Sequence, residues 1–92
     1  MDILIVDDEE FILEQSRYYL KEENGSFNIF TTSSASDGIK LLKKEEYDIV
    51  VSDYQMPGMD GLEFLQTLQD ESLDVPFIMF TGRGREEVAI QA

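Results

Sequence analysis

Three short runs of consecutive apolar residues place the strongest constraint on how this chain can fold. They cover residues 3–6, 49–51 and 77–80, and none of them is interrupted by a polar residue. Such runs are typical of strands that are covered on both faces, as in parallel sheets. Residues 27–32 instead alternate in polarity, which favours a less buried strand near a sheet edge. The sequence therefore predicts four strands.

The segments between these strands have apolar residues at the spacing of helices. Apolar residues recur every three or four positions over 11–19, 35–42 and 62–68, and we expect each stripe to pack in the core. Asp60 and Glu63 are placed to form a capping box at the start of the third helix. The alternation of strands and helices predicts an α/β domain with a parallel sheet and right-handed crossovers.

A fourth helix is expected at the end of the chain. It is predicted to start near Arg83 and to include Val88, Ala89 and Ala92. With 92 residues, the chain is expected to form one small domain with a thin core.

An excess of acidic residues excludes several classes of partner. The chain has 7 Lys plus Arg and 20 Asp plus Glu, which gives a net charge of −13 at pH 7. This charge repels phosphate backbones and anionic headgroups, so we expect neither nucleic-acid nor membrane binding by this segment. The sequence has no Cys and no His, which excludes disulfides, zinc sites and His-based catalysis. It has no apolar run of membrane-spanning length and no basic leader, so the expected compartment is the cytoplasm.

Polar residues follow the predicted strands at their carboxyl ends, where open α/β sheets bind ligands. Asp7, Asp8 and Glu9 follow the first strand, Asp53 follows the third and Thr81 follows the fourth. If the first and third strands are neighbours, the carboxylates of Asp7, Asp8 and Asp53 crowd together and need a counterion. Taken singly, each of these acids could equally be a solvated turn or a helix cap.

The chemistry of this predicted cluster favours Mg²⁺. Carboxylate oxygens without His or Cys are the donor set that Mg²⁺ prefers, together with waters and phosphate oxygens. A carboxylate beside such a metal can attack a phosphoryl group and form an aspartyl phosphate. Thr81 would then hydrogen-bond a phosphoryl oxygen.

Three segments, 3–9, 53–61 and 80–82, resemble the motifs of receiver domains of two-component response regulators, in their order and spacing. The resemblance implies a flavodoxin-like, doubly wound sheet of order 2-1-3-4-5. It also implies that Asp53 is the phosphoacceptor and that Thr81 is a switch hydroxyl. Mg²⁺ would be bound by Asp8, Asp53 and the backbone carbonyl of Gln55, with Asp7 acting through a metal-bound water.

The resemblance further implies the partners and the kind of activity. The phosphoryl donor would be a phosphohistidine on a sensor histidine kinase or a phosphotransfer protein, and a downstream effector would read the phosphorylated state. The chain would be a switch rather than an enzyme, with only self-catalysed phosphotransfer and dephosphorylation.

The sequence departs from the receiver pattern at its C-terminal end. Receivers continue through a fifth strand, which ends in a phosphate-pairing Lys, and a fifth helix, and none of the 7 basic residues here occupies that Lys position. We therefore expect residues 1–92 to be a receiver domain that is incomplete at its C-terminus. Residues 77–80 would then form an exposed hydrophobic edge, which predicts dimers or domain-swapped species.

Two other function classes compete with the receiver interpretation. Phosphatases and phosphotransferases with an Asp nucleophile need an acid/base Asp two residues later, where this chain has Gln55. A receiver fold that serves only for interaction or dimerisation, without phosphorylation, is the alternative that the missing Lys keeps open. The segment from Asp53 lacks the ligand pattern of an EF-hand, and the sequence contains no P-loop.

Overall fold

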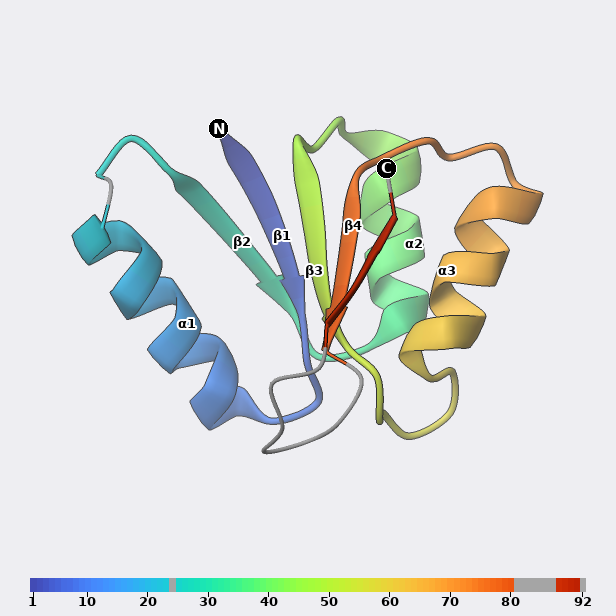
Figure 1. Cartoon of the computed structure of the whole chain (residues 1–92), viewed down its shortest axis with the longest axis horizontal. Coiled ribbons are helices and arrows are strands. Elements are labelled where there is room, and N and C mark those ends of the chain that lie inside the picture. The colour runs from blue at the N-terminus through green and yellow to red at the C-terminus, as the bar shows by residue number, and fades with distance from the viewer. Residues whose placement is uncertain (24, 81–87, 92) are drawn as a thin grey trace.

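The fold is a twisted sheet with helices on both faces, described by a computed structural model for residues 1–23, 25–80 and 88–91 (Figure 1). The strands are β1 (Asp2–Val6), β2 (Asn28–Thr32), β3 (Ile49–Asp53), β4 (Phe77–Phe80) and β5 (Val88–Gln91). The helices are α1 (Glu10–Glu23), α2 (Ala35–Lys44) and α3 (Gly61–Asp70). In the described part of the chain, no helix combines the length and apolar character that a membrane crossing requires.

The strand order is β2-β1-β3-β4-β5, and the first four of these strands are parallel. This order confirms the predicted doubly wound α/β sheet through its first four strands. It also confirms that the segment with alternating polarity, β2, lies at a sheet edge. Because β1 and β3 are neighbours, their carboxyl ends lie side by side, with Val6 paired to Ser52.

The segment Val88–Gln91 is a strand, so the helix predicted there is wrong. It pairs antiparallel with β4, with Phe80 opposite Val88 and Phe77 opposite Gln91. A four-residue segment is too short for helical and extended periodicity to be distinguished. The β-branched residues Val88 and Ile90 suit an extended conformation, and the open edge of β4 offers unpaired backbone groups. The predicted helix start near Arg83 lies outside the described residues.

The position beside β4 is therefore filled by a strand of the same chain. Because β5 is antiparallel to β4, it differs from the parallel fifth strand that the receiver pattern implies. It nevertheless satisfies the edge groups of β4 internally, so the expectation that β4 forms an exposed hydrophobic edge is wrong. The predicted dimerisation or domain swapping rested on that open edge, so its physical reason no longer holds.

Two groups of buried side chains sandwich the sheet. On the face covered by α2 and α3, Leu4, Val6, Val50 and Phe77 pack with Phe64 of α3. On the opposite face, which α1 covers, the buried residues are Ile3, Ile5, Leu13 and Ile29. Successive residues of β1 thus enter opposite layers, which explains why its sequence is continuously apolar.

Helix α1 buries a different stripe from the predicted one. Phe11, Tyr18 and Tyr19 are 61–70% exposed, whereas Leu13 is buried against the sheet. Leu13 and Leu20, seven residues apart, face the sheet. The buried stripe is therefore rotated about the helix axis relative to the predicted stripe, which included the aromatic residues. The rings of Tyr18 and Tyr19 contact each other edge to face, at 5.7 Å between centroids. The predicted core role of these aromatic residues is therefore wrong.

Candidate functional site

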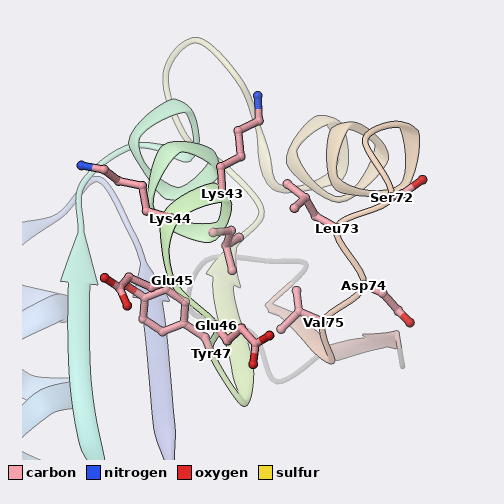
Figure 2. A pocket seen from close by; sticks show the side chains of 10 residues that line it. Lys43, Lys44, Glu45, Glu46, Tyr47, Ser72, Leu73, Asp74 and Val75 are labelled. Carbon is pink, nitrogen blue, oxygen red and sulfur yellow. The ribbon is translucent and has the colours of Figure 1, made fainter.

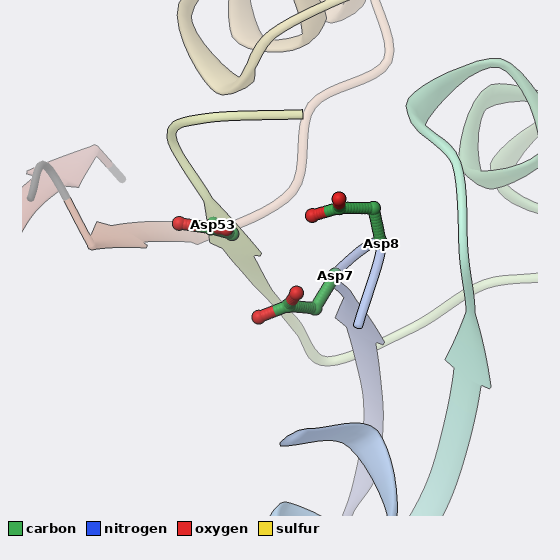
Figure 3. Close-up of side chains that lie close together, drawn as sticks. All are labelled: Asp7, Asp8 and Asp53. Carbon is green, nitrogen blue, oxygen red and sulfur yellow. The ribbon is translucent and has the colours of Figure 1, made fainter. Parts of the chain in front are cut away.

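Three carboxylates gather where β1 and β3 end (Figure 3). Asp7 directly follows β1, Asp8 follows it, and Asp53 is the last residue of β3. One carboxylate oxygen from each lies within 4.8 Å of the others. Asp7 and Asp53 are only 8% and 7% exposed, whereas Asp8 is half-buried. The structure therefore brings together the three acids that the sequence analysis singled out.

Backbone hydrogen bonds hold the segment that carries the first two of these acids. The backbone N–H of Asp7 donates to the carbonyl of Thr32 at the end of β2, at 3.2 Å. The carboxylate of Asp7 accepts the backbone N–H of Glu9 at 2.9 Å. One oxygen of Asp7 thus serves the turn into α1, which is the structural role that any Asp in this place could have. The burial of Asp7 beside Asp53 goes beyond what that turn requires.

The carboxylate of Asp53 is held by the loop that follows it. The backbone N–H groups of Tyr54 and Gln55 hydrogen-bond this carboxylate. Ser52, fully buried, donates its hydroxyl to the carbonyl of Asp53 at 2.9 Å. Amide groups at this position orient the side chain and stabilise its charged form.

Gly61 allows the β3–α3 loop to close tightly over the end of β3. Its N–H donates to the carbonyl of Tyr54 at 2.8 Å. A Cβ at this position would lie 2.6 Å from the carbonyl oxygen of Asp53 and 2.9 Å from Cα of Tyr54. Two of the three atoms that such a Cβ would approach within 3.0 Å are backbone, so a side chain at position 61 would displace the segment that carries Asp53.

The predicted capping box stabilises the start of α3 just beyond this contact. Asp60 accepts the N–H of Glu63 at 2.8 Å, and Glu63 accepts the N–H of Asp60 at 3.0 Å. The box fixes where α3 begins relative to β3.

Burial and neighbouring charge raise the pKa of Asp53. Loss of hydration is the largest cause, followed by repulsion from Asp7, with a smaller contribution from Asp8. The N–H groups of Gln55 and Tyr54 act in the opposite direction and lower this pKa. Because the pKa of Asp53 is raised, ionising all three carboxylates costs electrostatic free energy, which a bound cation would offset.

The raised pKa predicts that Asp53→Asn stabilises the metal-free protein at neutral pH. In the unfolded chain, Asp53 has a pKa of about 3.9. Just above that pH the folded state still keeps the Asp53 carboxyl group protonated, whereas the unfolded chain has released the proton. The stability associated with that proton is present below the unfolded pKa and lost as pH rises through the folded pKa. We expect the variant to be more stable by about 1 kcal/mol at pH 7, the size of one close like-charge interaction. Thermal unfolding in EDTA at pH 7 and in acid checks this.

The stability gained by Asp53→Asn should shrink toward zero in acid, where the protonated Asp53 side chain is neutral, as the Asn side chain is. Asp74→Asn, at an exposed carboxylate in the loop before β4, is the matched control and should change stability little at either pH. A gain from Asp53→Asn that is as large in acid as at pH 7 would contradict the electrostatic explanation.

The cluster has the donor set of a hard-cation site. Carboxylate oxygens alone, with one half-exposed side to admit water, fit Mg²⁺. A hollow lined by Asp8, Tyr54, Gln55, Met56, Pro57 and Asp60 opens beside the cluster. Gln55, whose backbone carbonyl is the predicted metal ligand, lines the same hollow as Asp8, and its side chain is exposed. Thr81, the predicted switch hydroxyl, lies outside the described residues.

Another cavity, of about 610 Å³, lies at the opposite end of the sheet between the C-terminal turn of α2 and the loop before β4 (Figure 2). Its rim carries both signs of charge, and Lys43 Nζ lies 2.6 Å from Glu71 Oε1. Burial, with smaller contributions from Glu45 and Asp2, raises the pKa of Tyr47 in its wall. Because this cavity is remote from the acids, it does not belong to the candidate site.

Comparison with known proteins identifies the family. The sequence model of the response regulator receiver domain matches residues 3–92. The chain belongs to the response regulator receiver family. This is a signalling family of two-component systems rather than a family of conventional enzymes. Receiver domains interact with histidine kinases and effector domains, and they typically bind Mg²⁺.

Individual relatives agree with this assignment. The cell cycle response regulator CtrA of Brucella ovis is 35% identical over 82 residues, which cover 89% of this chain and 34% of that protein. The chain thus spans about a third of the length of the curated relatives it matches. A CheY-like receiver domain protein from Methanospirillum hungatei JF-1 has a TM-score of 0.81 at 31% identity, covering 94% of this chain and 68% of that one.

A third similar protein was solved with a ligand. The MaeR response regulator bound to beryllium trifluoride has a TM-score of 0.79 at 28% identity, covering 90% of this chain and 68% of that one.

Sequence reasoning missed two features of the site. Gly61 was not assigned a role, although a Gly at the first position of a capped helix is a poor helix former and signals a close approach. The N–H groups that hold Asp53 belong to the backbone of Tyr54 and Gln55, and the residue types at these positions do not indicate such hydrogen bonds.

Proposed function

We propose that this chain is a phosphoacceptor module of a two-component phosphorelay, with residues 1–92 acting as one receiver unit and Asp53 as the acceptor. The observation that carries the proposal is the meeting of three carboxylates within 4.8 Å at the ends of adjacent strands. Asp53 is buried, repulsion from Asp7 and Asp8 raises its pKa, and two consecutive N–H groups hold its carboxylate.

The same residues would hold Mg²⁺ beside the acceptor. Asp8 and Asp53 would supply carboxylate oxygens, Gln55 its backbone carbonyl, and Asp7 would act through a metal-bound water. The metal would offset the charge that develops on the transferred phosphoryl group. The support for this assignment is the all-oxygen donor set and the pKa of Asp53, which repulsion within the cluster raises.

The transfer step is a displacement at phosphorus. A carboxylate oxygen of Asp53 forms a new P–O bond as the P–N bond of a donor phosphohistidine breaks, and the imidazole nitrogen keeps the electron pair. The N–H groups of Tyr54 and Gln55 orient the attacking carboxylate. Beryllium trifluoride, the ligand of the similar MaeR structure, has the charge and shape of a phosphoryl group, which is consistent with this assignment.

The remaining roles concern the switch and its partners. Thr81 would hydrogen-bond the phosphoryl group and pass the change to a partner-binding surface. The donor would be a sensor histidine kinase or a phosphotransfer protein, and the reader a downstream effector domain or protein. Because such relays draw on kinase-bound ATP, we place the chain in the cytoplasm.

Labelling with a small phosphodonor tests the proposal. We expect acetyl phosphate and Mg²⁺ to add the mass of one phosphoryl group to the wild-type protein. The Asp53→Asn variant should label at least about 100-fold less, because the nucleophile is gone. Asp74→Asn, which removes an exposed carboxylate elsewhere, should label as the wild type does. Equal labelling of wild type and Asp53→Asn would refute the acceptor role, and no labelling of either would favour a phosphorylation-independent interaction module.

A further inference from the structure

One edge of the sheet is formed by β2, which pairs with β1 alone among the described strands. In a parallel pair, every second residue of a strand directs its backbone groups toward the neighbouring strand. The N–H of Asn28 donates to the carbonyl of Met1 at 2.8 Å, so Asn28 is one of the residues that face β1. Ile29 and Thr31 alternate with the residues that face β1, and their backbone groups therefore point out of the sheet at its edge.

A side chain of α1 occupies part of this edge. Helix α1 lies beside β2 (Figure 1), and Arg17, in the middle of the helix, is half-buried. Arg17 Nη1 donates to the carbonyl oxygen of Ile29 at 3.1 Å, and Nη2 donates to the hydroxyl of Thr31 at 3.1 Å. The carbonyl that Arg17 reaches is one of those that the alternation along β2 directs outward.

The acceptors of Arg17 are uncharged in a chain that is rich in carboxylates. The chain has 20 Asp plus Glu, and Glu14 stands three residues before Arg17 on the same helix. Among the described residues, the side-chain ion pairs are formed by Lys40 and Lys43. The planar guanidinium of Arg17 instead directs two donors at neighbouring positions of the sheet edge. Its place in the structure is thus defined by that edge.

The strand that Arg17 covers is suited to pairing with another copy of itself. Residues 27–32 carry no charge and contain neither Gly nor Pro. If two β2 strands pair antiparallel about a two-fold axis at Phe30, Ile29 of one copy lies opposite Thr31 of the other. Residues opposite each other in this way exchange both backbone hydrogen bonds, which would use the outward groups of both residues. The side chain of Phe30, 43% exposed, would meet its own copy across the axis.

We propose that the edge of β2 is a latent site for antiparallel pairing with a second copy of this chain, and that Arg17 keeps this site closed. The guanidinium already occupies the Ile29 carbonyl that the pairing needs, and it places a charge in the path of the incoming strand. Charged side chains at sheet edges are a common protection against such pairing. A second copy is the partner that fits, because the uncharged segments 27–32 would bring no like charges opposite each other despite the net charge of −13.

Sedimentation equilibrium of paired variants tests the role of Arg17. Arg17→Met keeps an unbranched side chain but removes the guanidinium. We expect this variant to dimerise at least about 100-fold more tightly than the wild type, because each copy loses a charged hydrogen-bond contact worth about tenfold or more. Lys21→Met removes the same charge from an exposed position of α1 and should leave self-association at the wild-type level. Equal self-association of Arg17→Met and wild type would overturn the proposal, as would equal self-association of the two variants.

Second substitutions in the Arg17→Met background test the location and the register. Thr31→Pro removes an N–H that points out of the sheet, a change that edge strands tolerate, and should return self-association to the wild-type level. Phe30→Lys places like charges opposite each other and should weaken the dimer by about fivefold or more. It also makes the net charge less negative, which by itself would favour association. A dimer that survives Thr31→Pro in a folded protein would overturn the proposal.

Amide hydrogen exchange examines the same edge in the wild-type protein. The N–H groups of Ile29 and Thr31 should exchange faster than the N–H of Phe30, which faces β1. In Arg17→Met, the N–H groups of Ile29 and Thr31 should become protected as the protein concentration rises and the dimer forms. Protection of both N–H groups in the monomeric wild type, equal to that of Phe30, would overturn the proposal.

Discussion

Replacing Phe64 with alanine is expected to cost about 3–5 kcal/mol of the free energy of unfolding, as large-to-small changes of buried aromatic residues do. Phe64 is fully buried on the inner side of α3 and meets the ring of Phe77 of β4 edge to face, at 5.4 Å between centroids. Its Cζ lies 3.0 Å from where a Cβ on Gly38 of α2 would stand. One side chain thus joins both helices of this layer to the sheet, and its loss leaves a cavity among them.

Urea unfolding measures this loss. A chain of this size is expected to have a stability of about 5–14 kcal/mol, so the variant should show a much lower midpoint with a similar m-value. Leu62→Ala is the matched control, because Leu62 lies on the same helix and is 53% exposed. We expect that change to cost about 0.5 kcal/mol or less. Equal losses for the two variants would contradict the packing assigned to Phe64.

Mg²⁺ is expected to stabilise the wild-type protein by about 2.7 kcal/mol when its concentration exceeds the dissociation constant a hundredfold. The physical reason is that the ion would offset the charge of three carboxylates that folding places within 4.8 Å and that repel one another without it. Neutralising the half-buried acid by Asp8→Asn should remove most of this gain. Thermal unfolding of both proteins with and without Mg²⁺ measures it.

Two controls separate this binding from general screening of the net charge of −13. NaCl at matched ionic strength should give a much smaller gain, and Asp74→Asn should retain the full gain from Mg²⁺. Since bound carboxylates must be ionised, the gain should also disappear as pH falls through the raised pKa of Asp53. A gain from Mg²⁺ that is the same in Asp8→Asn and wild type would rule out this site.

The parts of the fold that follow from local pattern were predictable. The continuous run of β1 and the alternation of β2 indicated which strand is covered on both faces and which lies at an edge. The strand-end rule then placed Asp7, Asp8 and Asp53 together, because their strands are parallel neighbours. The capping box at Asp60 was readable from residue types alone, since it depends only on positions three apart.

The parts that failed depend on contacts distant in sequence. The strand Val88–Gln91 forms because an open edge of β4 is available, and nothing within four residues encodes that edge. The stripe of α1 was misjudged because Phe11, Tyr18 and Tyr19 are the larger apolar residues, whereas Leu13 and Leu20 face the sheet.

The central claim is that Asp53, among three adjacent acids, is the residue that takes the phosphoryl group. Borohydride reduction after labelling with acetyl phosphate and Mg²⁺ tests this most directly, because it converts an aspartyl phosphate to homoserine and so marks the acceptor permanently. Peptide mass mapping should find homoserine at position 53 and aspartate at positions 7 and 8. Homoserine at position 7 or 8 with aspartate at position 53 would contradict the claim.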